Sequence, residues 1–359
     1  MSSTSTTTTT TSPSADEQAP VVAVDANGAD LGPSEVAAGV ALAAERGARV
    51  LLFGPAAEIG AVPAGVELVD APVSIAKAPD PMRAVRSTPQ SSIVQAARAL
   101  GEGRAQALVC AGGTGAALAA GLFAVRRAPG IHRPALALPI PAPAGTVTLL
   151  DVGANDQARA EHLVQFAFMG AAFATAVLGV RSPRVALLSN GAERDRGSEL
   201  VLAAGARLDA ARSLRFVGHV EGDGIVAGVA DVVVADGLTG NVALKLMEGV
   251  SQQMLGAVRA AATASVRGKL GGLLLRPALR GFRDEIDPEA QGGAYLLGLR
   301  RLAVVPHGRF SRRGFAAAVA RAELGAREDV VAATHAALHE AGALRRAPVS
   351  ADPASLPDG

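Results

Sequence analysis

The stretch that decides the fold is residues 107–125, ALVCAGGTGAALAAGLFAV, which has the pattern of an apolar strand, a glycine-rich turn and a helix. Segments with the same strand pattern recur along the chain, at 21–25, 49–53, 66–69, 135–138, 146–150, 185–188, 214–217, 232–235 and 302–305. Several are continuous apolar runs, which is typical of strands covered on both faces. Helical patterns separate many of them. The sequence therefore predicts an α/β fold, with three α/β/α layers around a mostly parallel sheet.

Composition limits the class of protein. The chain has 359 residues, of which 49% are hydrophobic, 19% charged and 3% aromatic, and its formal net charge is +1. This is typical of a folded globular protein. A single cysteine, Cys110, excludes an internal disulfide framework and a cysteine-rich zinc site. Few aromatic residues and a balanced charge argue against a nucleic-acid partner.

The ends of the chain differ from its middle. Residues 2–14 form a Ser/Thr tract without an apolar stretch, so we expect 1–19 to be a disordered tail, 20–345 the folded domain, and 346–359 a second tail. The charge-free segment 163–180 has about the minimum length of a membrane-spanning helix. Its Gln165, and the charges of Glu161 and Arg181 just outside it, favour a helix buried in the core or in a dimer interface.

Polar, glycine-rich turns follow several of the expected strands, where α/β sheets bind ligands. They are 111–115, 151–155, 189–191, 236–241 and 306–308, and we expect them to converge on one crevice. The dinucleotide, P-loop and nucleophile-elbow motifs are absent. A phosphate-sized anion site remains, and we expect neither a metal nor a cofactor. Taken singly, Asp25 can be a turn cap, His307 a satisfied core histidine and Cys110 an inert small hydrophobe.

Seven collinear motifs resemble the bacterial phosphate acyltransferase family PlsX. They are VDANGAD (24–30), AVR (84–86) with SS (91–92), AGGTGA (111–116), LDVGAN (150–155), EHLVQFA (161–167) with MG (169–170), DGLTGN (236–241), and GGA (292–294) with LLG (296–298). The match covers about 21–323. The chain departs from the usual family motifs at Asn27, Ala29, Gly113 and Arg309.

The resemblance implies an enzyme that converts long-chain acyl-[acyl carrier protein] and inorganic phosphate to acyl phosphate and free carrier protein, in phospholipid (phosphatidic acid) biosynthesis. It also implies a homodimer with a fold similar to isocitrate dehydrogenase and phosphotransacetylase. The expected location is the cytoplasm, with peripheral contact to the inner face of the plasma membrane or to a membrane acyltransferase. Two alternatives stay open: a non-catalytic or divergent lipid-synthesis scaffold, and an isocitrate dehydrogenase-like oxidoreductase.

The predicted site has a catalytic and a binding set. His307 is the expected proton carrier, because its unperturbed pKa is near ~6.5. Asn155 and Asn190 are expected to donate hydrogen bonds to an oxyanion or phosphate, and Asp25 and Asp236 to orient donors. The residues expected to bind phosphate or the acyl group are Gly112, Gly113, Thr114, Gly115, Arg86, Ser91, Thr239, Gly240, Asn241, Lys245, Gly292 and Gly293.

Basic residues are concentrated in two stretches without Asp or Glu, 250–283 and 300–313. In the first we expect a basic helical hairpin at 250–285. Its cations are predicted to face the acidic carrier protein or an anionic membrane, and the named candidates are Arg259, Arg267, Lys269 and Arg276. An amphipathic helix pair with a solvated basic face is the simpler explanation.

Overall fold

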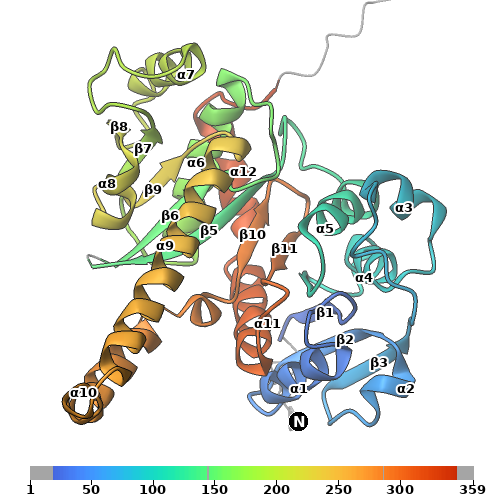
Figure 1. Cartoon of the computed structure of the whole chain (residues 1–359). Helices are drawn as coiled ribbons and strands as arrows, with labels where there is room; N and C mark the ends of the chain where they lie inside the picture. Colours follow the sequence, from blue (N-terminus) through green and yellow to red (C-terminus); the bar gives the residue numbers. More distant parts are fainter. Residues whose placement is uncertain (1–18, 144, 286, 346–359) are drawn as a thin grey trace, which may run out of the picture.

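One sheet of eleven strands runs through the described part of the protein, which in this computed structural model comprises residues 19–143, 145–285 and 287–345. The strand order is β3-β2-β1-β4-β11-β10-β5-β6-β9-β7-β8 (Figure 1). The strands are β1 (Val21–Asp25), β2 (Arg49–Gly54), β3 (Val66–Asp70), β4 (Ala107–Cys110), β5 (Ala135–Ala142), β6 (Gly145–Leu150), β7 (Val185–Leu188), β8 (Phe216–Val220), β9 (Val232–Val234), β10 (Ala294–Leu297) and β11 (Leu302–Val305). Apart from residue 19, the two predicted tails lie outside the described residues.

The sheet is mostly parallel, as predicted, but it contains two sets of strands that run in opposite directions. β10 is antiparallel to both β11 and β5, and β5 is antiparallel to β6. The set β3-β2-β1-β4-β11 therefore runs one way and the set β6-β9-β7-β8 the other. The turns that follow the two sets therefore leave the sheet at opposite ends, because the antiparallel strands reverse the chain direction between the sets.

Helices cover both faces of the sheet, which confirms the three-layer architecture. Alternate residues of β1 point to opposite faces, so Val22 and Val24 belong to one core and Ala23 to the other. The first core is covered by α1 (Pro33–Ala44), α6 (Ala160–Ala176), α7 (Glu199–Asp209), α11 (Arg312–Arg327) and α12 (Val330–Glu340). The second is covered by α3 (Pro81–Ser87), α4 (Ser92–Gly101), α5 (Thr114–Ala120), the π-helix η2 (Gly121–Val125) and α8 (Gly222–Ala227).

The apolar segment 163–180 forms most of α6, a buried helix of the first core. Gln165, the polar group that argued against a membrane span, is satisfied inside the protein. Its side-chain amide donates to the carbonyl oxygens of Gly130 (2.9 Å) and Ala343 (2.8 Å), and its carbonyl accepts from the backbone N–H of His132 (2.8 Å). No helix in the described ranges is both long and apolar enough to cross a membrane.

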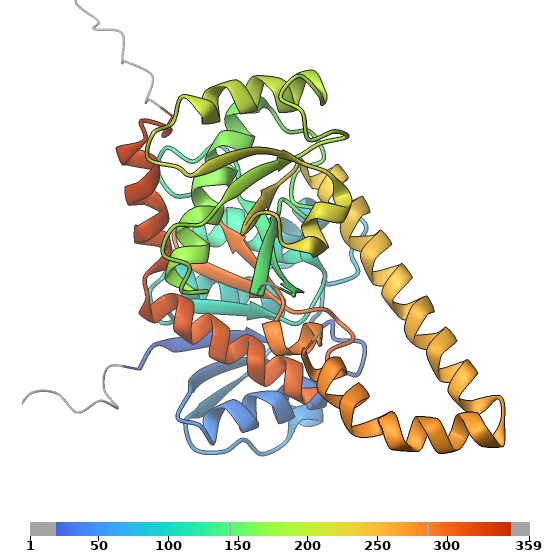
Figure 2. The same ribbon diagram turned by 90° about the vertical axis from the view of Figure 1, so that its left-hand side faces the viewer.

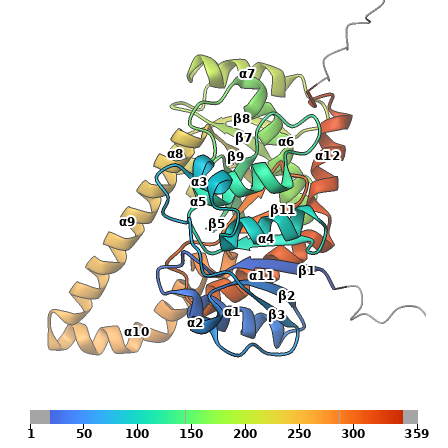
Figure 3. The ribbon, with the colours of Figure 1, turned by 90° about the vertical axis from the view of Figure 1, so that its right-hand side faces the viewer.

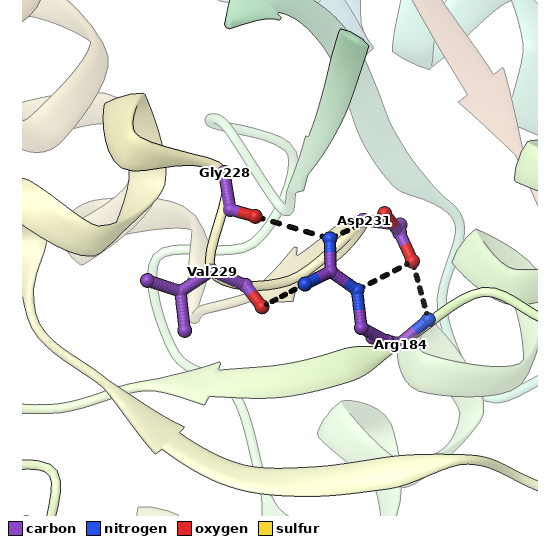
Figure 4. A network of polar contacts seen from close by, with 4 residues as sticks. All are labelled: Arg184, Gly228, Val229 and Asp231. Atoms are coloured by element: carbon purple, nitrogen blue, oxygen red, sulfur yellow. Dashed lines mark hydrogen bonds and ion pairs between the residues drawn. The ribbon is translucent and has the colours of Figure 1, made fainter. Parts of the chain in front are cut away.

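A polar network joins the starts of β7 and β9 (Figure 4). The Arg184 guanidinium donates to both carboxylate oxygens of Asp231 (2.9 and 3.1 Å) and to the carbonyl oxygens of Val229 and Gly228 (2.8 and 3.0 Å). This pairing lowers the pKa of Asp231. Arg184 thus ties the loop after α8 to the sheet.

A pair of long helices projects from this body, as Figures 1 and 2 show. They are α9 (Gly237–Thr263) and α10 (Val266–Glu285), and a short 3-10 turn, η3 (Pro288–Gln291), leads back to β10. The predicted basic segment at 250–285 therefore occupies most of a longer hairpin whose first helix begins at Gly237. The remaining helix is α2 (Ala56–Ile59) beside β3.

Candidate functional site

The glycine-rich loop after β4 packs directly on the chain that follows β1. A Cβ at Gly28 would lie 2.8 Å from the Cα of Gly112, and a Cβ at Gly113 would lie 2.4 Å from the carbonyl oxygen of Ala76. A Cβ at Gly115 would lie 3.0 Å from Pro81. A side chain at these positions would collide with the neighbouring loop, so the close packing of the loops explains why glycines occur here. It brings the end of β1 to the start of α5.

Asp25, at the end of β1, is buried beside this loop. A Cβ at Gly112 would be 3.7 Å from its Oδ2 atom, and Cys110 is its neighbour in the register of β1 and β4. Burial raises the pKa of Asp25 to about 7, although hydrogen bonds from Ser92 and from the backbone N–H of Asn27 lower it. The carboxyl group can thus gain and lose a proton near neutral pH. Burial also raises the pKa of the Cys110 thiol, which therefore stays protonated.

His307 lies in the loop after β11, at the same edge as Asp25. Its Nδ1 atom accepts from the backbone N–H of Arg309 (3.2 Å), so the Nε2 atom carries the proton of the neutral ring. Partial burial, and then the charge of Arg309, lower its pKa. The segment that follows β1 is held close to this loop, since the backbone N–H of Asp30 donates to the Gly308 carbonyl oxygen (2.8 Å).

The second group of predicted residues surrounds the start of α9. The Asp236 carboxylate caps this helix, accepting from the backbone N–H (2.9 Å) and the hydroxyl (2.6 Å) of Thr239. A Cβ at Gly240 would lie 1.9 Å from the Asp151 carbonyl oxygen, and one at Gly237 would lie 2.6 Å from the Asn155 carbonyl oxygen. The first turn of α9 therefore rests directly on the turn at 151–155.

Asp151 organises that turn. Its fully buried carboxylate accepts from the backbone N–H groups of Leu136, Gly153 and Ala154, at 3.0–3.2 Å. The Asn155 side-chain amide donates to Asp151 (2.8 Å) and to the Pro134 carbonyl oxygen (2.7 Å). Both amide hydrogens of Asn155 are therefore used inside the protein. This corrects its predicted role as a free donor, because here Asn155 positions the turn.

Helix α9 connects the two groups. Lys245 and Glu248, two turns into the helix, are close enough to His307 for their charges to act on its pKa. The Lys245 Nζ atom is 2.9 Å from Oε2 of Glu248. Thr239 and Asn241 lie exposed on the preceding turn. The helix thus extends from the turns of one strand set to the loop after β11 in the other.

Other predicted residues lie elsewhere on the surface or in the core. Arg86 is exposed on α3, with its guanidinium carbon 5.7 Å from the centre of the Phe123 ring. Ser91 is fully buried, and its hydroxyl has no hydrogen-bond partner among the described residues. Asn190 is exposed after β7. At Gly293 a Cβ would lie 2.6 Å from Pro306, so this glycine packs against the chain leading into His307, while Gly292 packs on α11.

Sequence reasoning missed Asp151, Glu248 and Ser92 as members of the site. Asp151 follows an apolar strand, a signal that was recognised for Asp25. Ser92 is fixed by the Asn27 amide, which donates to its hydroxyl at 3.0 Å. Among the described residues, no group of three or more His, Cys, Asp and Glu side chains is arranged to hold a metal ion.

The architecture places the protein among the three-layer α/β/α folds. A phosphotransacetylase from Streptococcus pyogenes superposes with a TM-score of 0.56 at 16% identity, over 86% of this chain and 94% of that chain. A 4-hydroxythreonine-4-phosphate dehydrogenase from Klebsiella pneumoniae superposes with a TM-score of 0.52 at 15% identity, over 86% of this chain and 98% of that chain. At such identities the likeness shows the fold alone, and it confirms the predicted fold class.

Sequence comparison then identifies the family. The family model described as "Fatty acid synthesis protein" matches residues 21–333. A protein named phosphate acyltransferase from Geobacillus thermodenitrificans is 41% identical over 323 residues, covering 88% of this chain and 98% of the relative. One of the same name from Leuconostoc citreum is 40% identical over 296 residues, covering 80% and 85%. The chain belongs to this family, and the predicted resemblance is confirmed.

Proposed function

We propose that this protein transfers a long-chain acyl group from acyl carrier protein to inorganic phosphate, in phospholipid (phosphatidic acid) biosynthesis. The observation that carries the proposal is the 41% identity, over 88% of the chain, to a relative named phosphate acyltransferase. The same family match favours this activity over a non-catalytic scaffold and over an isocitrate dehydrogenase-like oxidoreductase.

The reaction places defined demands on the site. A phosphate oxygen attacks the thioester carbon, the carbon–sulfur bond breaks, and the carrier thiolate takes up a proton. Thioesters and acyl phosphates are similarly activated, so no nucleotide is consumed. Phosphate is partly dianionic at neutral pH, since its second pKa is near ~6–7. The protein must therefore bind and orient phosphate, stabilise the tetrahedral oxyanion and supply the proton.

We assign phosphate binding to the loop at 112–115 and to the exposed side chains of Thr239, Asn241 and Lys245 at the start of α9. The backbone N–H groups that open a helix attract anions. Lys245 is paired with Glu248, so a bound phosphate would compete with this carboxylate for the ammonium group. Arg86 would have to leave the face of Phe123 to add charge there.

Proton transfer is assigned to Asp25 and His307. Asp25 has a pKa of about 7 and lies against Gly112 of the loop that we assign to phosphate. His307, with its lowered pKa, is neutral at physiological pH and presents Nε2–H as a donor. The protonated Asp25 carboxyl can deliver its proton directly to the departing thiolate, whereas His307 can deliver one only after it has taken up a proton and become imidazolium.

We assign the exposed apolar face of α9 to a dimer interface. Six side chains spaced four residues apart are each 49–65% exposed, namely Leu238, Val242, Leu246, Val250, Met254 and Val258. The stripe winds around the helix, and its four central members, Val242 to Met254, lie within about 120° of one another, which is typical of an interface face. Leu246→Glu should produce a monomer in analytical ultracentrifugation, whereas Gln252→Glu, which adds the same charge on another face of α9, should remain dimeric. Equal masses for both variants would contradict the assignment.

The basic side chains of the hairpin are assigned to an acidic carrier protein or an anionic membrane surface at the cytoplasmic side. Arg259, Arg267 and Lys269 are exposed, and the side chain of Arg276 lies outside the described residues. Exposed leucines, among them Leu270, Leu273 and Leu274, accompany them on α10. Neutralising the first three cations should weaken vesicle flotation or carrier binding in a salt-dependent way. Unchanged binding of both would leave the solvated face as the explanation.

The function is tested by release of the carrier thiol from palmitoyl carrier protein, with and without inorganic phosphate. Phosphate-dependent release is expected for the parent protein, and its loss for Asn241→Ala and Lys245→Ala. If both variants keep the parental turnover and phosphate dependence, the phosphate site is placed wrongly. If the parent protein itself shows no phosphate dependence, the proposed reaction is wrong.

A further inference from the structure

A hollow of about 480 Å³ lies beside the N-terminal ends of the central strands β4 and β11. Four arginines, Arg98, Arg126, Arg300 and Arg301, line it together with a single carboxylate, Glu102. All four arginines are exposed, and within the described residues none has a carboxylate oxygen within 4.0 Å of its guanidinium nitrogens. The protein as a whole is almost neutral, so this local excess of positive charge stands out.

The hollow is separate from the residues assigned to the reaction at the ends of the same strands. Arg300 and Arg301 directly precede β11, whereas His307 follows it. Glu102 precedes β4, and the glycine-rich loop at 111–115 follows β4. β1, β4 and β11 are parallel, and Figure 3 shows β1 pointing toward the side on which α9 and α10 lie. The hollow is therefore at the N-terminal ends of these strands, opposite the C-terminal ends where the residues assigned to the reaction lie.

The backbone brings the arginines together at some conformational cost. A Cβ at Gly101 would lie 2.4 Å from the Ala124 carbonyl oxygen, so a glycine is needed for the end of α4 to meet the end of η2. Arg126, which follows η2, has a φ of 70°, a conformation that residues with a Cβ rarely adopt. Its carbonyl oxygen accepts from the backbone N–H of Arg300 (3.0 Å), which fixes the two arginines side by side.

Guanidinium groups of this kind bind phosphate oxygens in pairs of parallel hydrogen bonds. Four such groups around a concave surface, with Glu102 as the single carboxylate of the lining, repel one another, and an anion bound between them relieves this repulsion. We propose that this hollow is a second anion site that binds a multiply charged phosphate group, separate from the site of acyl transfer. The group belongs either to a free phosphate compound or to an anionic lipid headgroup. The concave shape favours such a group over the convex surface of a carrier protein.

Calorimetric titration of the full chain with inorganic pyrophosphate tests the site. Arg300→Gln/Arg301→Gln should weaken pyrophosphate binding at least tenfold, while Arg212→Gln, an exposed arginine on the other strand set, should change it less than twofold. Arg126→Gly is the more demanding variant, because it removes a guanidinium and also relieves the backbone. It should weaken binding without lowering the melting temperature. In all variants the turnover and the phosphate KM should stay within twofold of the parent.

A parallel flotation assay compares vesicles with and without phosphatidic acid. Loss of pyrophosphate binding alone identifies a free phosphate compound as the ligand, and an additional loss of flotation with phosphatidic acid identifies the lipid headgroup. Both outcomes support the site. Unchanged binding of pyrophosphate in the arginine variants overturns it, as does a loss confined to carrier-protein binding. Because turnover is measured separately, neither result decides whether the protein catalyses the proposed acyl transfer, which has its own assay.

Discussion

Asp25→Asn removes a buried carboxyl group whose ionisation opposes folding. In the folded protein its pKa is about 7, whereas the ordinary value is 3.8. From about pH 4 to about pH 7 the folded state therefore holds a proton that the unfolded chain has released. The free energy of unfolding must fall as the pH rises through this window, because deprotonation favours the unfolded chain.

The size of the effect follows from the shift in pKa. About three pKa units correspond to about 4 kcal/mol at 1.36 kcal/mol per unit, which is an upper bound because buried groups relax when they ionise. The Asn side chain is neutral at every pH and can still accept from the backbone N–H of Asn27, which lies 3.1 Å from Oδ1 in the parent. The variant should match the parent near pH 4 and exceed its stability increasingly up to about pH 7.

Urea unfolding of both proteins at a series of pH values measures this difference. The account predicts a stability difference that grows between about pH 4 and pH 7 and is constant above it. The same variant should lose most of its phosphate-dependent turnover, because one of the two proposed proton carriers is gone. A stability difference that does not change with pH would refute the buried, titrating carboxyl group.

Three further predictions concern packing, the polar network and the proposed donor. Gly240→Ala should destabilise the protein by more than about 4 kcal/mol in thermal unfolding, since its Cβ would lie 1.9 Å from a backbone oxygen. Gly249 lies in open space on the same helix, so Gly249→Ala should stabilise the protein by about 1 kcal/mol. Arg184→Gln should lower the free energy of urea unfolding by about 1–3 kcal/mol, against less than about 0.5 kcal/mol for the exposed Arg212→Gln; equal losses would contradict the network. His307→Gln should lower kcat/KM at least tenfold and abolish the decline of kcat/KM as the pH rises through the lowered pKa of His307, and an unchanged pH profile would remove His307 from the mechanism.

The strand predictions came from short apolar runs, and these runs carry most of the fold. β4, β7 and β11 were predicted with their observed bounds because each is a four-residue buried strand that ends at a turn. β10 was missed, since its four residues follow two glycines and were assigned to a binding motif. β5 extends to Ala142 through Pro139 and Pro141, which local reasoning assigns to a turn.

Strand direction and side-chain pairing were not predictable in the same way. The reversal between the two strand sets depends on contacts between β10, β5 and β6, whose residues are far apart along the chain. The use of both Asn155 amide hydrogens depends on where Pro134 lies, which no local pattern specifies. The cap of α9 is different, because an Asp three residues before a Thr at a helix start is a local signal. Local geometry and the layered architecture were thus predictable, whereas strand direction and long-range side-chain partners were not.

The most direct test of the proposed function is the chemical identity of the product. Palmitoyl carrier protein, isotopically labelled inorganic phosphate and the parent protein are incubated together, and one portion is separated directly to measure labelled acyl phosphate. In a second portion hydroxylamine converts acyl phosphate to a hydroxamate and releases the phosphate, and a sample without protein corrects for the direct reaction of hydroxylamine with the thioester. The account predicts that label enters an acyl phosphate in equal amount to the carrier thiol released, and that trapping depends on phosphate. Release of free fatty acid without labelled product would contradict it.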